Sequence, residues 1–299
     1  MKRTLTAALT AVTLAVLAAC SSGSPEAVPT EASTDDPVTV TIGVTDINKE
    51  YWTTFTELAA EEGITVELKN FTDYQQPNPA LSNGQLDLNQ FQHLLFLANY
   101  NENSGDDLVA IGSTVIYQLG LYTDKDYATP DDIPDGAQIA IPNDATNQAR
   151  ALLVLQSAGL ITLKDGGNAL STPADVVTEQ SRVQVVPVDA NQTAVQLRSL
   201  DAAVINNNFA ADAQLDPTSA IYSDLDDTDT ARPYVNIFAA RAEDADNPLF
   251  ATLVEIYHRP EVIDQVLESN EGTAVEQDLT ADELATSLTE LQDLVRDAG

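Results

Sequence analysis

The chain alternates short apolar segments with longer segments in which apolar residues recur at helical spacing. Residues 38–44 alternate Val and Ile with Thr and Gly, which is typical of a strand. Residues 51–62 carry apolar side chains three and four positions apart, and Gly63 ends that predicted helix. Residues 64–68 have the pattern of a second strand. The order strand, helix, strand predicts a parallel crossover unit.

The same alternation continues to the C-terminus and predicts an α/β fold with mainly parallel sheets. Strands are expected at residues 109–122, 138–141, 183–186, 202–205 and 234–240. Helices are expected at residues 145–158, 191–200, 250–257, 260–267 and 281–296. Between the first crossover unit and these elements, the pattern predicts a short helix capped by Asn78, a short strand at 86–89 and a helical run at 91–100.

Two long β-like stretches, near residues 115–122 and 234–241, are candidates for chain crossings between two lobes. The first lobe is then expected to comprise residues 38–118 and 237–299, and the second lobe residues 119–236. Ligands of such folds bind in the crevice beyond the strand ends, at the interface between lobes. The expected architecture is therefore two-lobed, with a ligand cleft between the lobes.

The N-terminus has the features of an export signal. Lys2 and Arg3 precede an apolar stretch too short to span a bilayer, and small residues follow it. Residues 17–20 (Leu-Ala-Ala-Cys) resemble the bacterial lipobox, which implies cleavage after residue 19 and lipid attachment to Cys20, the single cysteine. The alternative is a signal peptide that contains a cysteine by chance. Residues 1–19 are thus predicted to be a signal peptide and Cys20 to be lipidated.

Residues 20–37 are predicted to be a flexible tether. From residue 21 on, the segment is rich in Ser, Thr, Pro, Glu and Asp and lacks aromatic residues, so it has too little apolar surface to order itself. At about 3 Å per residue, it could hold the folded part tens of ångströms above a membrane.

The chain is strongly acidic, with a formal net charge of −34 at pH 7. Such a surface repels nucleic acid and anionic lipid head groups. Solubility explains this charge as well as any cationic partner does. The charge therefore excludes nucleic-acid binding and leaves the function open.

Residues 142–159 offer the most informative chemistry. A buried strand is predicted to end at 141, polar residues that can cap a helix follow, and Gly159 ends the next helix. Free backbone N–H groups at the start of such a helix attract anions. Arg150 lies in the first or second turn, where a cation is disfavoured unless an anion accompanies it. The segment predicts a site for a small carboxylate, such as that of an amino acid, although Arg150 could also be a surface residue.

Five segments after the tether carry distinctive motifs: Phe-Thr-Asp-Tyr-Gln-Gln-Pro-Asn at 71–78, Asp-Leu-Asn-Gln-Phe-Gln-His at 87–93, Pro-Asn-Asp-Ala-Thr-Asn-Gln-Ala-Arg at 142–150, Ala-Val-Ile-Asn at 203–206 and Tyr-Val-Asn at 234–236. Together they resemble the methionine-binding lipoproteins of ATP-driven importers, the NlpA-type family. The resemblance covers nearly all of the chain after the tether. The resemblance implies a two-lobed periplasmic binding fold of type II.

The resemblance also implies a role for each candidate residue. Arg150 pairs with the ligand carboxylate, while Asn206 and Asn236 orient the amino-acid head group. The side-chain pocket and the remaining motif positions complete the predicted site with Tyr74, Phe91, His93, Phe96, Asn143 and Asn147. The family usually has Tyr at Phe96 and Pro at Leu95, and shows Pro and His within the region that is 45–50 here. These departures leave open which side chain the pocket prefers.

Some candidates also have ordinary structural explanations. His93 beside three apolar residues could be a satisfied core histidine, and Tyr74 and Phe91 could be core aromatics. Asn206 could be a turn residue. Asn236 inside an apolar strand needs a partner, because an unpaired buried amide costs about 1–3 kcal/mol. Trp52 and Tyr117 are expected in the core or at a rim, and the acidic loop 224–229 is interpreted as a solvated turn.

The predicted function is capture of methionine, or a related apolar amino acid, outside the cell and delivery to a membrane permease. The protein is expected at the cell membrane, lipid-anchored on its extracytoplasmic face, with no cofactor and no metal. Alternatives are a different ligand (a dipeptide, another amino acid or a metal) or an envelope hydrolase. The sequence has no Gly-x-Ser-x-Gly elbow and few histidines, so neither catalysis nor transition-metal binding is favoured.

Overall fold

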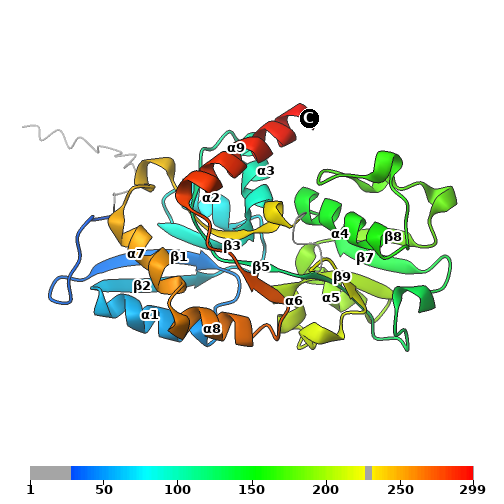
Figure 1. Cartoon of the computed structure of the whole chain (residues 1–299), viewed down its shortest axis with the longest axis horizontal. Coiled ribbons are helices and arrows are strands. Elements are labelled where there is room, and N and C mark those ends of the chain that lie inside the picture. Colours follow the sequence, from blue (N-terminus) through cyan, green and yellow to red (C-terminus); the bar gives the residue numbers. More distant parts are fainter. Residues whose placement is uncertain (1–27, 226–230, 299) are drawn as a thin grey trace, which may run out of the picture.

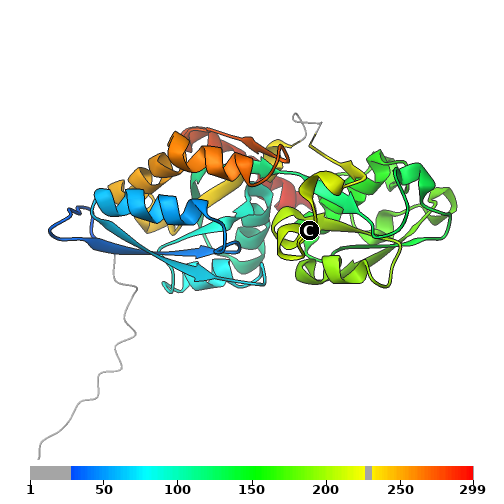
Figure 2. The ribbon, with the colours of Figure 1, turned by 90° about the horizontal axis from the view of Figure 1, so that it is seen from below.

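A computed structural model describes residues 28–225 and 231–298 of the chain. The predicted signal peptide, Cys20 and residues 21–27 of the predicted tether lie outside these residues. The described residues form two lobes side by side along the long axis of the molecule, each built on a five-stranded sheet (Figures 1 and 2).

The sheet of the first lobe has the strand order β2-β1-β3-β11-β4. Its strands are β1 (Val38–Val44), β2 (Ile64–Asn70), β3 (Leu88–His93), β4 (Val109–Ser113) and β11 (Asn236–Ala240). Strand β1 is parallel to β2 and β3, as the crossover pattern predicted. Strand β11 enters from the second lobe and is antiparallel to both β3 and β4.

Helices cover both faces of this sheet. One face packs on α1 (Tyr51–Glu61), α7 (Pro248–Tyr257) and α8 (Pro260–Glu268), and the other on α2 (Pro77–Ser82), α3 (Leu94–Ser104) and α9 (Ala281–Ala298). Alternate residues of β11 divide between the two layers: Phe238 belongs to the first core and Ile237 to the second. A strand buried on both faces reads as a continuous apolar run, which is the pattern seen in the sequence.

The sheet of the second lobe has the strand order β10-β6-β9-β7-β8. Its strands are β6 (Leu119–Tyr122), β7 (Gln138–Pro142), β8 (Gln184–Val188), β9 (Ala202–Asn206) and β10 (Tyr222–Ser223). Strand β7 is parallel to β8 and β9, whereas β6 is antiparallel to β9 and β10. Helix α4 (Ala145–Ser157) packs on one face, and α5 (Thr193–Gln196) and α6 (Asn207–Asp212) on the other.

The predicted strand 109–122 is three strands with different partners. Strand β4 belongs to the first sheet and β6 to the second, while β5 (Val115–Tyr117) pairs with β12 (Ala274–Glu276) as a separate antiparallel ribbon. The chain therefore crosses between the lobes at residues 114–118 (Figure 1). An apolar pattern shows that a segment is extended, but it does not show where the segment changes partner.

Four other element predictions need correction. Residues 91–93 extend β3, so Phe91 lies in a strand and the helix begins only at Leu94. Asn78 lies inside α2, whose N-cap is Gln76. The predicted helix at 191–200 is a 3-10 turn (Ala190–Gln192) followed by the short α5. Tyr234 ends a 3-10 turn (Arg232–Tyr234), because Pro233 at the start of that turn favours it over a strand.

The other 3-10 turns fall in the loops. They are Pro130–Asp132, Lys164–Gly166, Pro173–Asp175, Thr178–Gln180, Pro217–Ser219 and Ala242–Asp244. The turn at Pro173–Asp175 is capped at its start, where the Thr172 backbone N–H donates to the Asp175 carboxylate over 2.8 Å.

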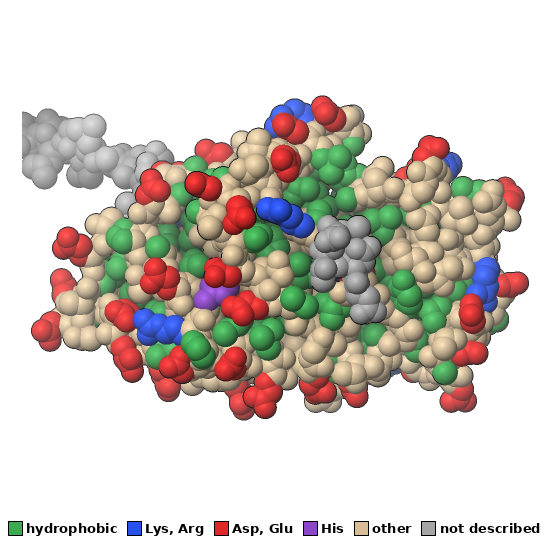
Figure 3. Space-filling view, viewed as in Figure 1, with side chains coloured by type: hydrophobic (Ala, Val, Ile, Leu, Met, Phe, Trp, Pro, Cys, Tyr) green, Lys and Arg blue, Asp and Glu red, His purple; other side chains and the backbone are tan. Residues whose placement is uncertain are grey.

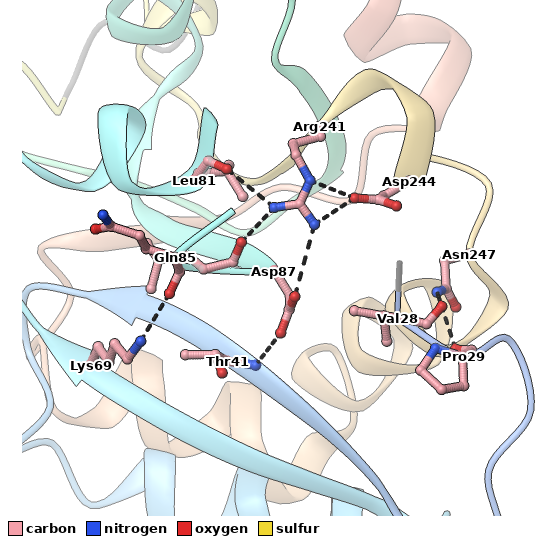
Figure 4. Close-up of polar contacts among 11 residues, drawn as sticks. Val28, Pro29, Thr41, Lys69, Leu81, Gln85, Asp87, Arg241, Asp244 and Asn247 are labelled. Atoms are coloured by element: carbon pink, nitrogen blue, oxygen red, sulfur yellow. Dashed lines mark hydrogen bonds and ion pairs between the residues drawn. The ribbon is translucent and has the colours of Figure 1, made fainter. Parts of the chain in front are cut away.

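The second half of the predicted tether packs against the first lobe. Val28 is buried in the first core, and the Asn247 amide donates to the carbonyl oxygens of Val28 and Pro29 over 3.2 Å each (Figure 4). Ser33 and Asp36 form a small bridge beside Gly63, where a Cβ would overlap the Ser33 backbone. The expectation of a flexible tether through residue 37 is therefore wrong for residues 28–37. Two apolar residues, Val28 and Ala32, and backbone pairing order this polar segment.

A buried charge network holds together the end of the first lobe that is remote from the cavity. The Arg241 guanidinium pairs with Asp244 over 2.6 Å and with Asp87 over 3.8 Å, and it donates to the carbonyl oxygens of Leu81 and Leu86 (Figure 4). Asp87 in turn accepts from the backbone of β1 at Thr41 over 2.7 Å. This network links α2, β1 and the end of β11.

Acidic side chains are spread over the surface of both lobes (Figure 3). Across residues 28–225 and 231–298, no helix has the length and apolar character needed to span a bilayer.

Candidate functional site

A cavity lies where the two lobes meet, with about 740 Å³ of empty volume that includes solvent at its mouth. It is bounded by the end of β3 and the start of β11 in the first lobe, by the start of α4 and the end of β9 in the second, and by the β5 crossing. Eight of the nine predicted binding residues line it: Tyr74, Phe91, His93, Phe96, Asn147, Arg150, Asn206 and Asn236.

Asn143 does not join them. Its side chain is exposed on the outer side of the Tyr74 and Phe96 wall, and its amide donates to Asp189 at the end of β8 over 2.7 Å. Asn143 was predicted to bind the ligand because it belongs to the motif at residues 142–150. Its position before the helix N-cap turns it away from the cavity.

Arg150 is deeply buried and held on several sides. Its side chain is 5% exposed, and its Nε donates to the Asp224 carboxylate over 2.6 Å. Its Nη2 donates to the Tyr117 carbonyl over 2.8 Å, and the guanidinium lies 4.3 Å from the centre of the Tyr234 ring. The alternative interpretation, that Arg150 is a surface residue, is therefore wrong. The expected solvated turn at 224 is also wrong for Asp224, whose carboxylate pairs with this arginine.

The start of α4 differs from the expected open anion site. Asp144 is the N-cap, and its carboxylate accepts from both the backbone and the side-chain amide of Asn147 over 3.0 Å. Burial raises the pKa of Asp144, and these hydrogen bonds oppose the shift. A carboxylate of the chain itself thus takes the place at the helix terminus where the sequence analysis put the ligand, and Arg150 remains as the candidate anion partner.

Two asparagines of the second lobe pair side by side in the cavity wall. The Asn206 amide nitrogen donates to the Asn147 oxygen over 2.9 Å. The Asn206 oxygen is buried and has no hydrogen-bond partner within residues 28–225 and 231–298. A buried acceptor without a partner is costly, so this oxygen is a ready site for an ammonium or N–H group of a ligand.

Asn236 begins β11. A buried amide requires a hydrogen-bond partner, and the Asn236 amide has one only over a long distance. Its amide donates to the Tyr234 carbonyl over 3.4 Å. This contact is near the limit of hydrogen bonding, so the amide can turn to a better partner in the cavity.

His93 presents a donor to the cavity. Its Nδ1 accepts from the Phe96 backbone N–H over 3.1 Å, which caps α3 and leaves the ring proton on Nε2. Burial, and next the charge of Arg150, lower the pKa of His93 to about 3, so the ring is neutral. Within the described part of the chain, the buried Nε2 has no partner. It is therefore a neutral N–H donor open to a ligand.

Aromatic rings form the wall opposite the polar groups. Tyr74 lies 6.0 Å from Phe91, 6.3 Å from Phe96 and 4.9 Å from Phe209, measured between ring centres. Because Phe209 belongs to α6 of the second lobe, this cluster joins the lobes. The Tyr74 hydroxyl also donates to the Asn208 oxygen across the same boundary.

One end of the cavity is charged, which was not predicted from the sequence. Asp46 and Lys49, in the loop after β1, line it together with Tyr51. The Asp46 carboxylate accepts from the Tyr51 hydroxyl and from Trp52 Nε1, and burial raises its pKa. The sequence does depart from the family pattern in this loop. That departure, however, does not show that Asp46 pairs with Tyr51 and Trp52. Trp52 itself is buried in the core as expected.

Further lining residues were missed because they carry no distinctive motif. Tyr117, expected in the core or at a rim, lines the cavity at the crossing together with Gln118. Asn207 and Asn208, which follow the predicted binding residue Asn206, also line it. Within the described residues, no group of three or more His, Cys, Asp and Glu side chains is placed to hold a metal ion.

Comparison with known proteins agrees with this arrangement. Residues 40–277 match the family model described as NlpA lipoprotein. The chain is 38% identical to the D-methionine-binding lipoprotein MetQ of Escherichia coli (strain K12) over 219 residues, which are 71% of this chain and 78% of the relative.

Two solved structures are similar in fold. The substrate-binding protein of a methionine transporter from Streptococcus pneumoniae matches with a TM-score of 0.74 and 37% identity, covering 80% of this chain and 95% of that one. A nutrient-binding protein from Burkholderia cenocepacia bound to methionine matches with a TM-score of 0.74 and 37% identity, covering 80% and 99%. The two-lobed binding-protein fold expected from the sequence is confirmed, and the chain belongs to the NlpA lipoprotein family.

Proposed function

We propose that this protein captures methionine outside the cell and delivers it to the membrane permease of an ATP-driven importer. The observation that carries the proposal is the composition of the cavity. Three groups face a space that aromatic rings wall on one side: a buried guanidinium, a neutral His93 N–H donor, and an Asn206 oxygen that has no partner among the described residues. A zwitterion with an apolar side chain supplies the guanidinium and the Asn206 oxygen with charged partners and fits the aromatic wall.

The ligand carboxylate pairs with Arg150 in a charge-assisted contact. The ammonium group donates to the Asn206 oxygen, and Asn236 orients the same head group. Tyr74, Phe91, His93 and Phe96 surround the side chain. The thioether of methionine suits these walls, because sulfur–aromatic contacts are favourable.

Binding is coupled to closure of the lobes over the ligand. Tyr74 donates to Asn208 across the cleft, and the Asn191 amide donates to the Thr72 carbonyl over 2.9 Å near its rim. Hinge motion about two chain crossings is a known mode of closure. We propose residues 38–118 and 237–299 as one rigid body and 119–236 as the other.

Lipid on Cys20 would hold the protein at the extracytoplasmic face of the membrane. Seven residues separate Cys20 from Val28, which is buried in the first core. Fully extended, they span roughly 25 Å. The folded body would thus lie closer to the membrane than an 18-residue tether over 20–37 implied.

Native mass spectrometry of the purified protein, followed by a thermal-shift screen of amino acids, tests the proposed ligand. Bound methionine, or stabilisation by methionine above other amino acids, is expected, because a ligand that binds the folded state raises its stability. Stabilisation by zinc or manganese that EDTA abolishes, with no response to amino acids, would reject the proposal. Hydrolysis of ester or peptide substrates that His93→Ala abolishes would instead reveal an enzyme.

A further inference from the structure

Asp224 is hydrogen-bonded to the Arg150 guanidinium, which lines the binding cavity. Its Oδ2 accepts from Arg150 Nε over 2.6 Å, and its Oδ1 from Arg150 Nη2 over 3.2 Å. Oδ1 also accepts from the Leu119 backbone N–H, at the start of β6, over 2.8 Å. Both oxygens are therefore engaged, and the contact with Arg150 is bidentate.

This pairing determines which nitrogen atoms of Arg150 are free to contact a ligand. The Nε and Nη2 edge is taken by Asp224 and by the Tyr117 carbonyl. Within the described residues, the Nη1 group has no hydrogen-bond partner, and the side chain lines the cavity. Asp224 thus fixes the plane of the guanidinium and leaves the Nη1 group for a ligand.

The same pairing balances the charge around the cavity. The charged side chains that line it are Asp46, Lys49 and Arg150. His93 is neutral, for the reasons given above. Asp224 lies behind Arg150 and offsets its charge, while the Asp144 carboxylate at the start of α4 is a third acidic group beside the cavity. Without Asp224, the surroundings of the ligand would be one charge more positive and would favour an anion more than they do in the wild type.

We propose that Asp224 is a positioning residue that sets the charge of the ligand. By neutralising Arg150 while orienting it, Asp224 makes the cavity select a zwitterion of zero net charge over an anion with the same carboxylate and the same side chain. This inference rests on the proposed function, because it concerns the same cavity and the same carboxylate contact. In this proposal the site recognises the ligand carboxylate and also discriminates between ligands by their net charge.

The test uses two ligands that differ at one group. Methionine is a zwitterion, and 2-hydroxy-4-(methylthio)butanoate replaces its ammonium group by a hydroxyl group and so carries one negative charge. Calorimetric titration of the full chain gives the ratio of the two affinities. In Asp224→Asn, which keeps the shape of the side chain, we expect this ratio to move towards the hydroxy acid by about tenfold, because the ammonium group loses a neighbouring negative charge.

A matched control is Asp135→Asn. Asp135 also pairs with an arginine of the second lobe, Arg182, over 3.1 Å, but its side chain is 85% exposed and does not line the cavity. This control changes the net charge of the protein by the same amount, and we expect the wild-type affinity ratio. Asp224→Glu, which keeps the charge, is also expected to keep the ratio near that of the wild type.

Equal weakening of both ligands in Asp224→Asn would overturn the inference, because a purely structural role moves both affinities together. If that variant does not fold, Asp224→Ser serves as the second neutral variant and is judged by the same ratio. Wild-type protein that binds neither ligand would overturn the proposed function as well. Wild-type binding of methionine with an unchanged ratio in the neutral variants overturns only the role of Asp224.

Discussion

The Tyr74 hydroxyl in the first lobe donates a hydrogen bond to the Asn208 side-chain oxygen in the second lobe. Tyr74 is at the same time part of the aromatic wall, 4.9 Å from Phe209 between ring centres. One side chain therefore both encloses the ligand space and ties the lobes together. Since this bond joins the two lobes, we expect its loss to weaken the closed state.

Tyr74→Phe is expected to weaken methionine binding by about two- to tenfold. The ring and the wall remain, but the closed state loses one hydrogen bond, which is worth about 0.5–1.5 kcal/mol. Calorimetry gives the affinity, and small-angle scattering gives the fraction of open molecules. Tyr100→Phe is the control, since Tyr100 bonds to Asp106 within the first lobe. Equal effects of the two changes would show that the contact across the cleft has no special role.

Arg150→Ala is expected to weaken methionine binding by at least about tenfold. The change removes the charge-assisted partner of the ligand carboxylate and leaves the Asp224 carboxylate without its cation. Arg182→Ala removes a surface arginine of the same lobe and is expected to leave the affinity unchanged. Unchanged affinity in Arg150→Ala, measured by titration, would reject the assigned pose.

His93 is expected to make the stability of the protein depend on pH. Its pKa is lowered from 6.5 to about 3, so below pH 6.5 the unfolded chain binds a proton that the folded protein does not. Its contribution is fully present above pH 6.5 and is lost as the pH falls towards 3, at about 1.4 kcal/mol per unit. Between pH 7 and pH 5 the loss is about 2 kcal/mol.

His93→Asn removes this titration and keeps a side chain that can cap α3. Urea unfolding at pH 7 and pH 5 should show a smaller loss of stability in the variant than in the wild type. Methionine binding by the wild type should show no step near pH 6.5, because the folded ring stays neutral there. A binding step at that pH would show that His93 titrates in the folded protein.

Arg241→Met is expected to lower the free energy of unfolding by about 3–5 kcal/mol. The change leaves the buried Asp244 carboxylate and two carbonyl oxygens without their donor, and uncompensated buried charges are costly. Urea unfolding measures the effect. Arg259→Met, at a partly exposed pair with Glu62, is the control and should change stability by less than about 1 kcal/mol.

The fold was largely predictable because its signals are local. Strand and helix periodicity, Gly63 after α1 and Gly159 after α4 follow from neighbouring residues, and both glycines have the positive φ that a helix stop requires. The incorrect predictions concern segments whose structure depends on contacts with residues far away in the sequence. The docking of Val28 depends on Asn247, and the course of residues 114–118 depends on pairing with β12.

The candidate site shows the same division. The family motifs brought eight predicted residues to one cavity, but Asp224 and Asp46 were not foreseen as part of it. Asp224 is 74 residues from Arg150 along the chain, and a run of acidic residues has the pattern of a solvated loop. Asp144 was interpreted as one of several capping residues, and periodicity does not show that its own carboxylate fills the helix terminus.

The most direct test of the central claim is calorimetric titration with methionine of protein that has been unfolded, freed of ligand and refolded. The account predicts saturable binding of one methionine per chain, with heat that Arg150→Ala largely removes. Refolded wild-type protein that gives no binding heat and no thermal shift with either L- or D-methionine would contradict it.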